Sequence, residues 1–171
     1  AVGGRVARLL RTGLLPSAAH GATVSGVTDT TLQGLRTIAG ELVGAKKACS
    51  LTGYLMMQSD LQYDPIYDCT IAVIREYCAW VWEARGSLGK VQRAWMQLKP
   101  KMDKNPTWAL ARGPLGAVWL SLLRIGWDMR SAHIIQDDFG GTYSLLKFAP
   151  CDVRQLLIWG AQRWQTRRLT T

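Results

Sequence analysis

The sequence predicts a mainly α-helical protein, an irregular bundle of about six helices with one small β-hairpin. Three observations support this fold class. Apolar residues recur three and four positions apart over most of the chain, which is helical spacing. Residues that favour helix starts and helix ends flank these segments. One region, near residues 132–146, instead combines short β-prone runs with turn residues, as a hairpin does.

The composition fits a folded domain with an excess of basic residues. The chain has 171 residues, 48% of them hydrophobic, and a formal net charge of +9. This length indicates one or two domains, and the hydrophobic content excludes a disordered or collagen-like chain. No apolar stretch reaches the length of about 18 residues that a membrane-spanning helix needs. Because the chain starts at Ala1 rather than at Met, we expect a fragment or a processed piece.

Two helices are predicted in the first 47 residues. Residues 2–14 have apolar side chains at helical spacing. The second helix begins after Thr28, a suitable N-cap, with Asp29 in its first turn, where the helix dipole stabilises a carboxylate. Gly44 suits the position just after that helix. Its predicted apolar stripe consists of Leu32, Leu35, Ile38, Ala39, Leu42 and Val43.

The middle of the chain predicts three more helices. A short one is expected from Cys49 to Met57, and a long one starts at Asp64-Pro65 and ends before Gly86. The next helix begins after Ser87, and Pro100 is expected to kink or end it. Its apolar face consists of Val91, Ala94, Trp95, Leu98 and Met102. Its other face is basic and polar, with Lys90, Arg93, Gln97, Lys101 and Lys104.

The last third of the chain predicts two helices around the hairpin. The first follows Gly113-Pro114 and ends at Gly126. The turn of the hairpin is assigned to residues 136–141, between short runs at 132–135 and 142–146. Pro150 begins the final helix, whose inward side consists of Val153, Leu156, Leu157, Gly160 and Trp164.

No residue of the sequence is predicted to be catalytic or to bind a metal, and no cofactor is expected. The pair Asp137-Asp138 is a candidate metal-binding pair, because paired aspartates hold two Mg²⁺ ions in polymerases. The glycines that follow this pair favour an ordinary turn instead. The four cysteines form no C-x-x-C pair, so they predict buried thiols in a reducing compartment rather than a zinc site. No phosphate-binding glycine motif occurs.

Basic residues gather in the first helix, in the helix after Ser87 and in the last helix, whereas residues 48–84 hold five acidic residues and one basic residue. Such faces can neutralise phosphates of a nucleic acid, or they can simply be solvated. The tryptophans in the apolar stripes, Trp95 and Trp164, are expected in the core. The candidate nucleic-acid-binding residues are Arg5, Arg8, Arg11, Lys46, Lys47, Lys90, Arg93, Lys101, Lys104, Arg163, Arg167 and Arg168.

Several short motifs stand near the start of the chain: Gly13-Leu14-Leu15-Pro16, His20-Gly21-Ala22, Val27-Thr28-Asp29 and Leu32-Gln33-Gly34-Leu35-Arg36. This string resembles the segment just after the palm in reverse transcriptases of LINE-like retroelements. Later motifs are similar to the region after the polymerase in polyproteins of dinoflagellate-type, non-LTR retrotransposons. These are Asp64-Pro65, Trp80-Val81-Trp82, Ala111-Arg112-Gly113-Pro114-Leu115, Arg124-Ile125-Gly126-Trp127, Asp137-Asp138-Phe139-Gly140 and Asp152-Val153-Arg154-Gln155-Leu156-Leu157.

The resemblance implies a non-catalytic region that holds the RNA or DNA template–primer by basic helix faces. Residues 1–47 would form a thumb-like helical segment and residues 48–171 a helical connector domain, unless the two form one continuous domain. The catalytic aspartates of the polymerase would lie upstream of Ala1, so this chain alone is not expected to be an enzyme. Its neighbours would be other domains of the polyprotein, in the nucleus or the cytoplasm of a cell.

Two alternatives stay open at the level of sequence. The first is a helical interaction or scaffold subunit that docks on an acidic protein partner or on a membrane surface, since basic helices with apolar neighbours suit such a role. The second is an enzyme that uses Asp137 and Asp138 with Mg²⁺.

Overall fold

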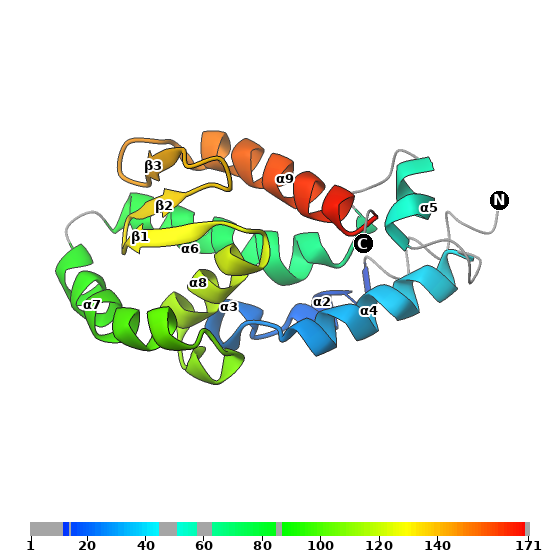
Figure 1. Ribbon diagram of the computed structural model, residues 1–171, viewed down its shortest axis with the longest axis horizontal. Helices are drawn as coiled ribbons and strands as arrows, with labels where there is room; N and C mark the ends of the chain where they lie inside the picture. Colours follow the sequence, from blue (N-terminus) through cyan, green and yellow to red (C-terminus); the bar gives the residue numbers. More distant parts are fainter. Residues whose placement is uncertain (1–11, 14, 45–50, 58–62, 85–86, 170–171) are drawn as a thin grey trace.

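The computed structural model describes residues 12–13, 15–44, 51–57, 63–84 and 87–169. Within this part, eight α-helices and one three-stranded antiparallel sheet form the fold (Figure 1). The predicted fold class, mainly α with a small β-hairpin, is confirmed. The predicted helix over residues 2–14 lies almost entirely outside the described residues. The same holds for five candidate binding residues, Arg5, Arg8, Arg11, Lys46 and Lys47.

The described helices and strands follow one another along the chain in two halves. The first half consists of α2 (Leu15–Ala19), α3 (Ala22–Ser25), α4 (Asp29–Leu42), α5 (Leu51–Met57), a π-helical segment (Tyr67–Ile71) and α6 (Ala72–Glu83). The second half consists of α7 (Leu88–Lys104), a 3₁₀ turn (Trp108–Leu110), α8 (Pro114–Arg124), β1 (Asp128–Ser131), β2 (Ile134–Gln136), β3 (Thr142–Ser144) and α9 (Pro150–Arg167).

The sheet contains the predicted hairpin and one further strand. Strands β2 and β3 pair antiparallel across the turn at 137–141, with Ile135 opposite Tyr143. Strand β1 pairs with the other edge of β2 and contains an irregularity between Met129 and Ser131. Strand β1 was not predicted, because its four residues, Asp-Met-Arg-Ser, are not a β-prone run. The hairpin prediction was therefore correct but incomplete.

One apolar core joins the early helices to the late ones. Buried side chains of α4, including Leu32 and Leu35, belong to the same cluster as Val81 of α6, Leu122 of α8 and Leu157 of α9. Figure 1 shows α7 and α9 on opposite sides of the molecule, with α6 and α8 between them. A smaller cluster contains Leu15, Ala39, Leu51 and Leu55. The division of the chain near residue 47 stays a prediction.

Several predicted helix features are confirmed and others are wrong. Thr28 caps α4, because its hydroxyl accepts a hydrogen bond from the Thr31 backbone N–H at 3.2 Å. Ile38 and Leu42, which were expected inward, are each 43% exposed. Their stripe is broader than the surface that α4 buries against its neighbours.

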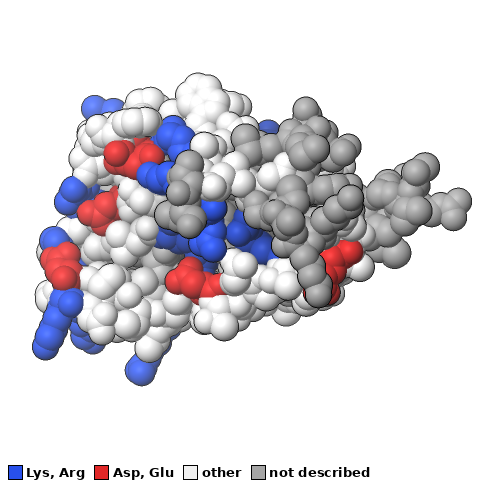
Figure 2. Space-filling model, turned by 45° about the vertical axis from the view of Figure 1, so that its right-hand side comes forward, with Lys and Arg blue, Asp and Glu red and all other residues white. Residues whose placement is uncertain are grey.

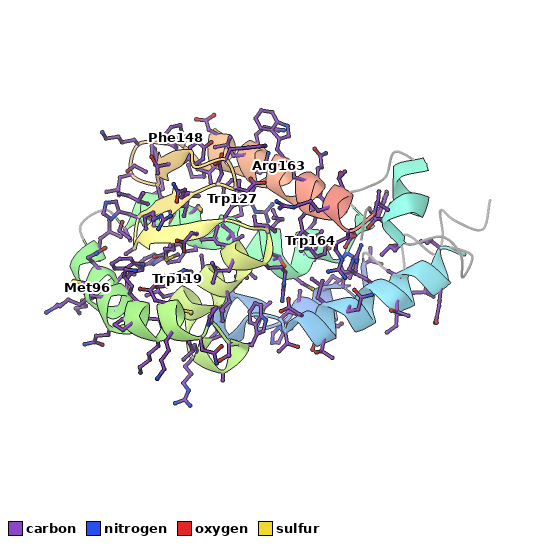
Figure 3. All side chains as sticks on the ribbon, in the orientation of Figure 1. Met96, Trp119, Trp127, Phe148, Arg163 and Trp164 are labelled. Atoms are coloured by element: carbon purple, nitrogen blue, oxygen red, sulfur yellow. The ribbon has the colours of Figure 1, made fainter. Side chains whose placement is uncertain are left out.

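Pro100 neither ends nor breaks α7, which continues to Lys104. The proline removes the donor that would bind the Met96 carbonyl. Met96 is 52% exposed and points away from the body of the molecule (Figure 3), so water can hydrate that carbonyl. Beyond the proline, Met102 is only 3% exposed. Its burial holds the last turn of α7 against the core, so the two lysines after Pro100 stay on the helix.

A buried ion pair connects three elements near the C-terminal end of α9. Arg36 of α4 lies 2.9 Å from Asp64, and both side chains are buried. The guanidinium also donates to the Thr52 hydroxyl of α5 and lies over the Trp164 ring at 5.1 Å. Asp64 caps as predicted, since its carboxylate accepts a hydrogen bond from the Ile66 backbone N–H at 3.0 Å.

None of the described helices combines the length and the apolar character that crossing a membrane requires.

Candidate functional site

Helix α7 displays four of the predicted binding residues on one narrow face. Lys90, Arg93, Lys101 and Lys104 are exposed. At about 100° per residue they fall, together with Gln97, within an arc of roughly 80° around the helix. Their positions span about 21 Å along the axis, at 1.5 Å per residue. The sequence thus correctly placed these side chains on one face.

The opposite face of α7 is anchored to the core. Trp95 stacks on Trp119 of α8, with ring centroids 5.7 Å apart and planes within 10°. The Trp95 indole N–H donates to the Met129 carbonyl of β1 at 3.3 Å. The side chain of Gln92 accepts from the Ala132 backbone N–H at 3.1 Å. These contacts hold the basic face in a set orientation relative to the sheet and α8.

The four cations on this face form no ion pair with the described residues. The one acidic residue in the sequence of α7, Asp103, instead pairs with Lys99 at 2.6 Å. By helical spacing, these two residues lie on the other side of the helix from Lys90. All four charges are therefore available to a ligand from solvent.

The arginines at the end of α9 are arranged differently. The carboxylate of Asp138, in the β2–β3 turn, accepts a hydrogen bond from the Arg163 Nε–H at 2.9 Å and lies 3.3 Å from the Arg167 guanidinium. Arg167 also donates to the Ile125 carbonyl at 2.8 Å. Arg168 donates to the Gln33 side chain at 3.0 Å and lies over the Trp164 ring. Each of these three candidate residues thus stabilises the fold.

The electrostatics of this cluster agree with the geometry. Burial alone would raise the pKa of Asp138. The hydrogen bonds from Arg163 and the charges of Arg163 and Arg167 outweigh that effect and hold the pKa below its usual range. Figure 2 shows that basic and acidic side chains adjoin one another at several places on the face in view. Part of the basic excess is thus neutralised within the molecule.

The pair Asp137-Asp138 serves the turn. Asp137 Oδ1 accepts from the backbone N–H groups of Phe139 at 2.9 Å and Gly141 at 2.7 Å. Its Oδ2 accepts from the Tyr143 hydroxyl at 2.8 Å. With Asp138 bound to two arginines, both carboxylates have structural partners. Among the described residues, no group of three or more His, Cys, Asp and Glu side chains is arranged to hold a metal ion.

The cysteines that the structure describes are free thiols. Cys69 and Cys78 are buried, and Cys151 is exposed. Burial, with a smaller contribution from Asp68, raises the pKa of Cys69 to about 11. Burial likewise raises the pKa of Cys78 to about 12. Both buried thiols are therefore protonated at neutral pH, which gives them a packing role rather than a nucleophilic one.

An apolar groove next to α7 was not predicted from the sequence. It has a volume of about 480 Å³ and lies among α3, α6, α7 and α8. Val24 and Trp80, which are 54% and 42% exposed, line it together with Lys90 and Glu76. Periodicity could not reveal the groove, because it forms between helices that are distant in sequence.

The comparisons with known proteins leave the chain without an assigned family. No family model, curated protein or solved structure matches it. The retroelement resemblance accordingly stays a prediction.

Proposed function

We propose that this protein contacts nucleic acid through the basic face of α7, as a non-catalytic region of a reverse transcriptase polyprotein from a LINE-like retroelement. One observation carries the proposal. Lys90, Arg93, Lys101 and Lys104 lie exposed on one arc of an anchored helix, with no ion pair to the described residues. The motifs of the N-terminal and later segments supply the retroelement context.

The spacing of these charges suits a phosphate backbone. Their positions rise along the helix over about 21 Å, which is the scale of several phosphates of a duplex. Long flexible side chains let each ammonium or guanidinium reach a phosphate without a change in the helix. Contacts of this kind carry no base sequence information. The proposal therefore predicts binding that tolerates many sequences and weakens steeply with salt.

The test is the salt dependence of binding to a short DNA duplex, measured by fluorescence anisotropy. Four phosphate contacts contribute about −3.6 to the slope of log K against log salt concentration. The variant K90Q/R93Q/K101Q/K104Q is expected to lose that part of the slope. Its matched control is R75Q/R112Q/K147Q/R154Q, which removes the same charge from exposed positions outside α7. The proposal is contradicted if both variants lose the same part of the slope, or if the wild-type protein does not bind the duplex at low salt.

The retroelement context has a test of its own. A reverse transcriptase palm ends in a strand hairpin that carries a Y-x-D-D motif, and this motif is expected shortly upstream of Ala1 in the reading frame that encodes the chain. An upstream frame that encodes an unrelated protein contradicts the polyprotein assignment, while the nucleic-acid test on α7 stands independently.

The apolar groove favours a second candidate function, a helical module that binds an acidic partner. An amphipathic helix of such a partner would place apolar side chains against Val24 and Trp80 and carboxylates near Lys90. Trp80→Ala separates the two functions because its ring lines the groove but lies on α6. If the protein is a nucleic-acid module, this variant keeps its affinity for the duplex. If it is a protein-binding module, the variant loses its affinity for acidic amphipathic peptides.

A further inference from the structure

A hollow of about 640 Å³ lies between the β2–β3 turn and α9, and two exposed aromatic rings line it. Phe139 at the tip of the turn is 79% exposed, and Trp159 of α9 is 49% exposed. The wall between them includes Gln162, Arg163 and Arg167. Exposed aromatic rings forgo the free energy of burial, so two of them in one hollow call for an explanation.

The turn holds Phe139 in a defined position. The carboxylate of Asp137 accepts hydrogen bonds from the backbone N–H groups of Phe139 and Gly141. Gly140 adopts φ of +88°, a conformation that other residues rarely take, and thereby closes the tight turn. The guanidinium of Arg163 lies 4.7 Å from the centre of the Phe139 ring. The ring is thus displayed by a rigid loop and supported from one side by a cation.

The charges around the hollow favour an anion. Two guanidinium groups, of Arg163 and Arg167, and one carboxylate, of Asp138, line the hollow, and both arginines contact that carboxylate. Arg167 is also the more exposed of the two, with 52% of its side chain open to solvent. Gln162 adds an amide that can both donate and accept hydrogen bonds. A planar aromatic ligand that carries a phosphate would match this lining. Its ring suits the two aromatic side chains, its phosphate suits the arginines, and its polar edge suits the Gln162 amide.

We propose that this hollow is a subsite for an unpaired nucleotide of single-stranded nucleic acid. The base stacks on Trp159 and Phe139, its polar edge meets Gln162, and its phosphate lies near Arg167. Stacking of this kind requires an exposed base face, which a paired base inside a duplex does not offer. The inference rests on the proposed nucleic-acid function and narrows it, because it assigns single strands to this hollow and backbone phosphates to α7.

The experiment compares a short oligothymidylate strand with the same strand annealed to its complement. Phe139→Ala and Trp159→Ala are each expected to weaken single-strand binding by fivefold or more, the range for loss of one base-stacking ring. Binding of the duplex is expected to stay unchanged. The matched control is Trp80→Ala, which removes a tryptophan of similar exposure, 42% against 49% for Trp159, from the groove beside α7. Trp159→Phe keeps an aromatic face and is expected to restore most of the affinity.

The outcomes separate this inference from the function on which it rests. Both alanine variants remove exposed side chains, so their thermal unfolding should match that of the wild type, and this control shows that a loss of binding is local. If the wild type binds single strands and both variants bind them equally well, the stacking subsite is refuted while the function of α7 stands. If the wild type binds neither probe at low salt, both proposals fail.

Discussion

Helices α7 and α9 are both basic, yet their charges have opposite roles. On α7, Lys90 and its three neighbours on the same face have no acidic partner among the described residues. On α9, Arg163 and Arg167 bind Asp138 and Arg168 binds Gln33. The net charge of +9 counts both sets alike. A charged helix therefore offers its full charge to a ligand only where tertiary structure brings no counter-charge to it.

The largest expected effect comes from the buried side of α7. Trp95→Ala removes a ring that stacks on Trp119 and donates to the Met129 carbonyl. The free energy of unfolding is expected to fall by about 3–5 kcal/mol, as for other buried aromatic side chains. Chemical denaturation measures this change. A loss below about 1 kcal/mol would show that α7 is not anchored through this ring.

A smaller effect is expected from the centre of the arginine cluster. Asp138→Asn leaves Arg163 and Arg167 without their carboxylate, so the free energy of unfolding is expected to fall by about 1–3 kcal/mol. Affinity for duplex DNA should stay the same or rise, because two guanidinium groups lose one counter-charge. Weaker DNA binding by a folded Asp138→Asn protein would contradict the division of roles between the two helices.

Acid provides an independent check on the same cluster. The pKa of Asp138 is lowered in the folded protein, so its contribution to stability is complete above the unfolded value of about 3.9. The contribution is lost as the pH falls from there through the lower folded pKa. Asp138→Asn is expected to flatten this part of the stability profile. Identical acid profiles for the variant and the wild type would show that the carboxylate gains nothing from its arginines.

The smallest effect is expected at the exposed end of α9. Arg168→Gln removes a hydrogen bond to Gln33 and a contact with the Trp164 ring at the surface. The free energy of unfolding should change by about 1 kcal/mol or less. Affinity for duplex DNA should change by less than about twofold, because one distant charge adds little at physiological salt. A loss of affinity as large as that from a lysine of α7 would make Arg168 part of the interface.

Local patterns in the sequence were sufficient to predict both helices, α7 and α9, but not the partners of the arginines on α9. The basic stripe of α7 and its opposite apolar stripe follow from helical spacing alone. The role of Asp138 depends on a turn that packs against α9, although 25 residues separate it from Arg163. The same limit applies to the partner of Asp64, because Arg36 lies 28 residues away. Sequence spacing carries no signal for such long-range pairs.

The hairpin illustrates a further limit. The acidic and glycine residues at 137–141 correctly predicted the turn between β2 and β3. They did not reveal that Phe139 would stay exposed or that Trp159 would lie at the same hollow, since both rings fit an apolar core as well as a surface. Exposure of an aromatic ring is decided by which elements pack over it, and that information is not in the local sequence.

The most direct test of the division between the two helices is the salt dependence of duplex binding in two charge variants. One variant is K90Q/R93Q/K101Q/K104Q on α7, and the other is R163Q/R167Q/R168Q on α9. The α7 variant is expected to lose most of the slope of log K against log salt and roughly 100-fold in affinity at low salt, with unchanged stability. The α9 variant is expected to keep the slope and lose stability. The reverse pattern, with the slope lost on α9 and kept on α7, would contradict the proposed interface.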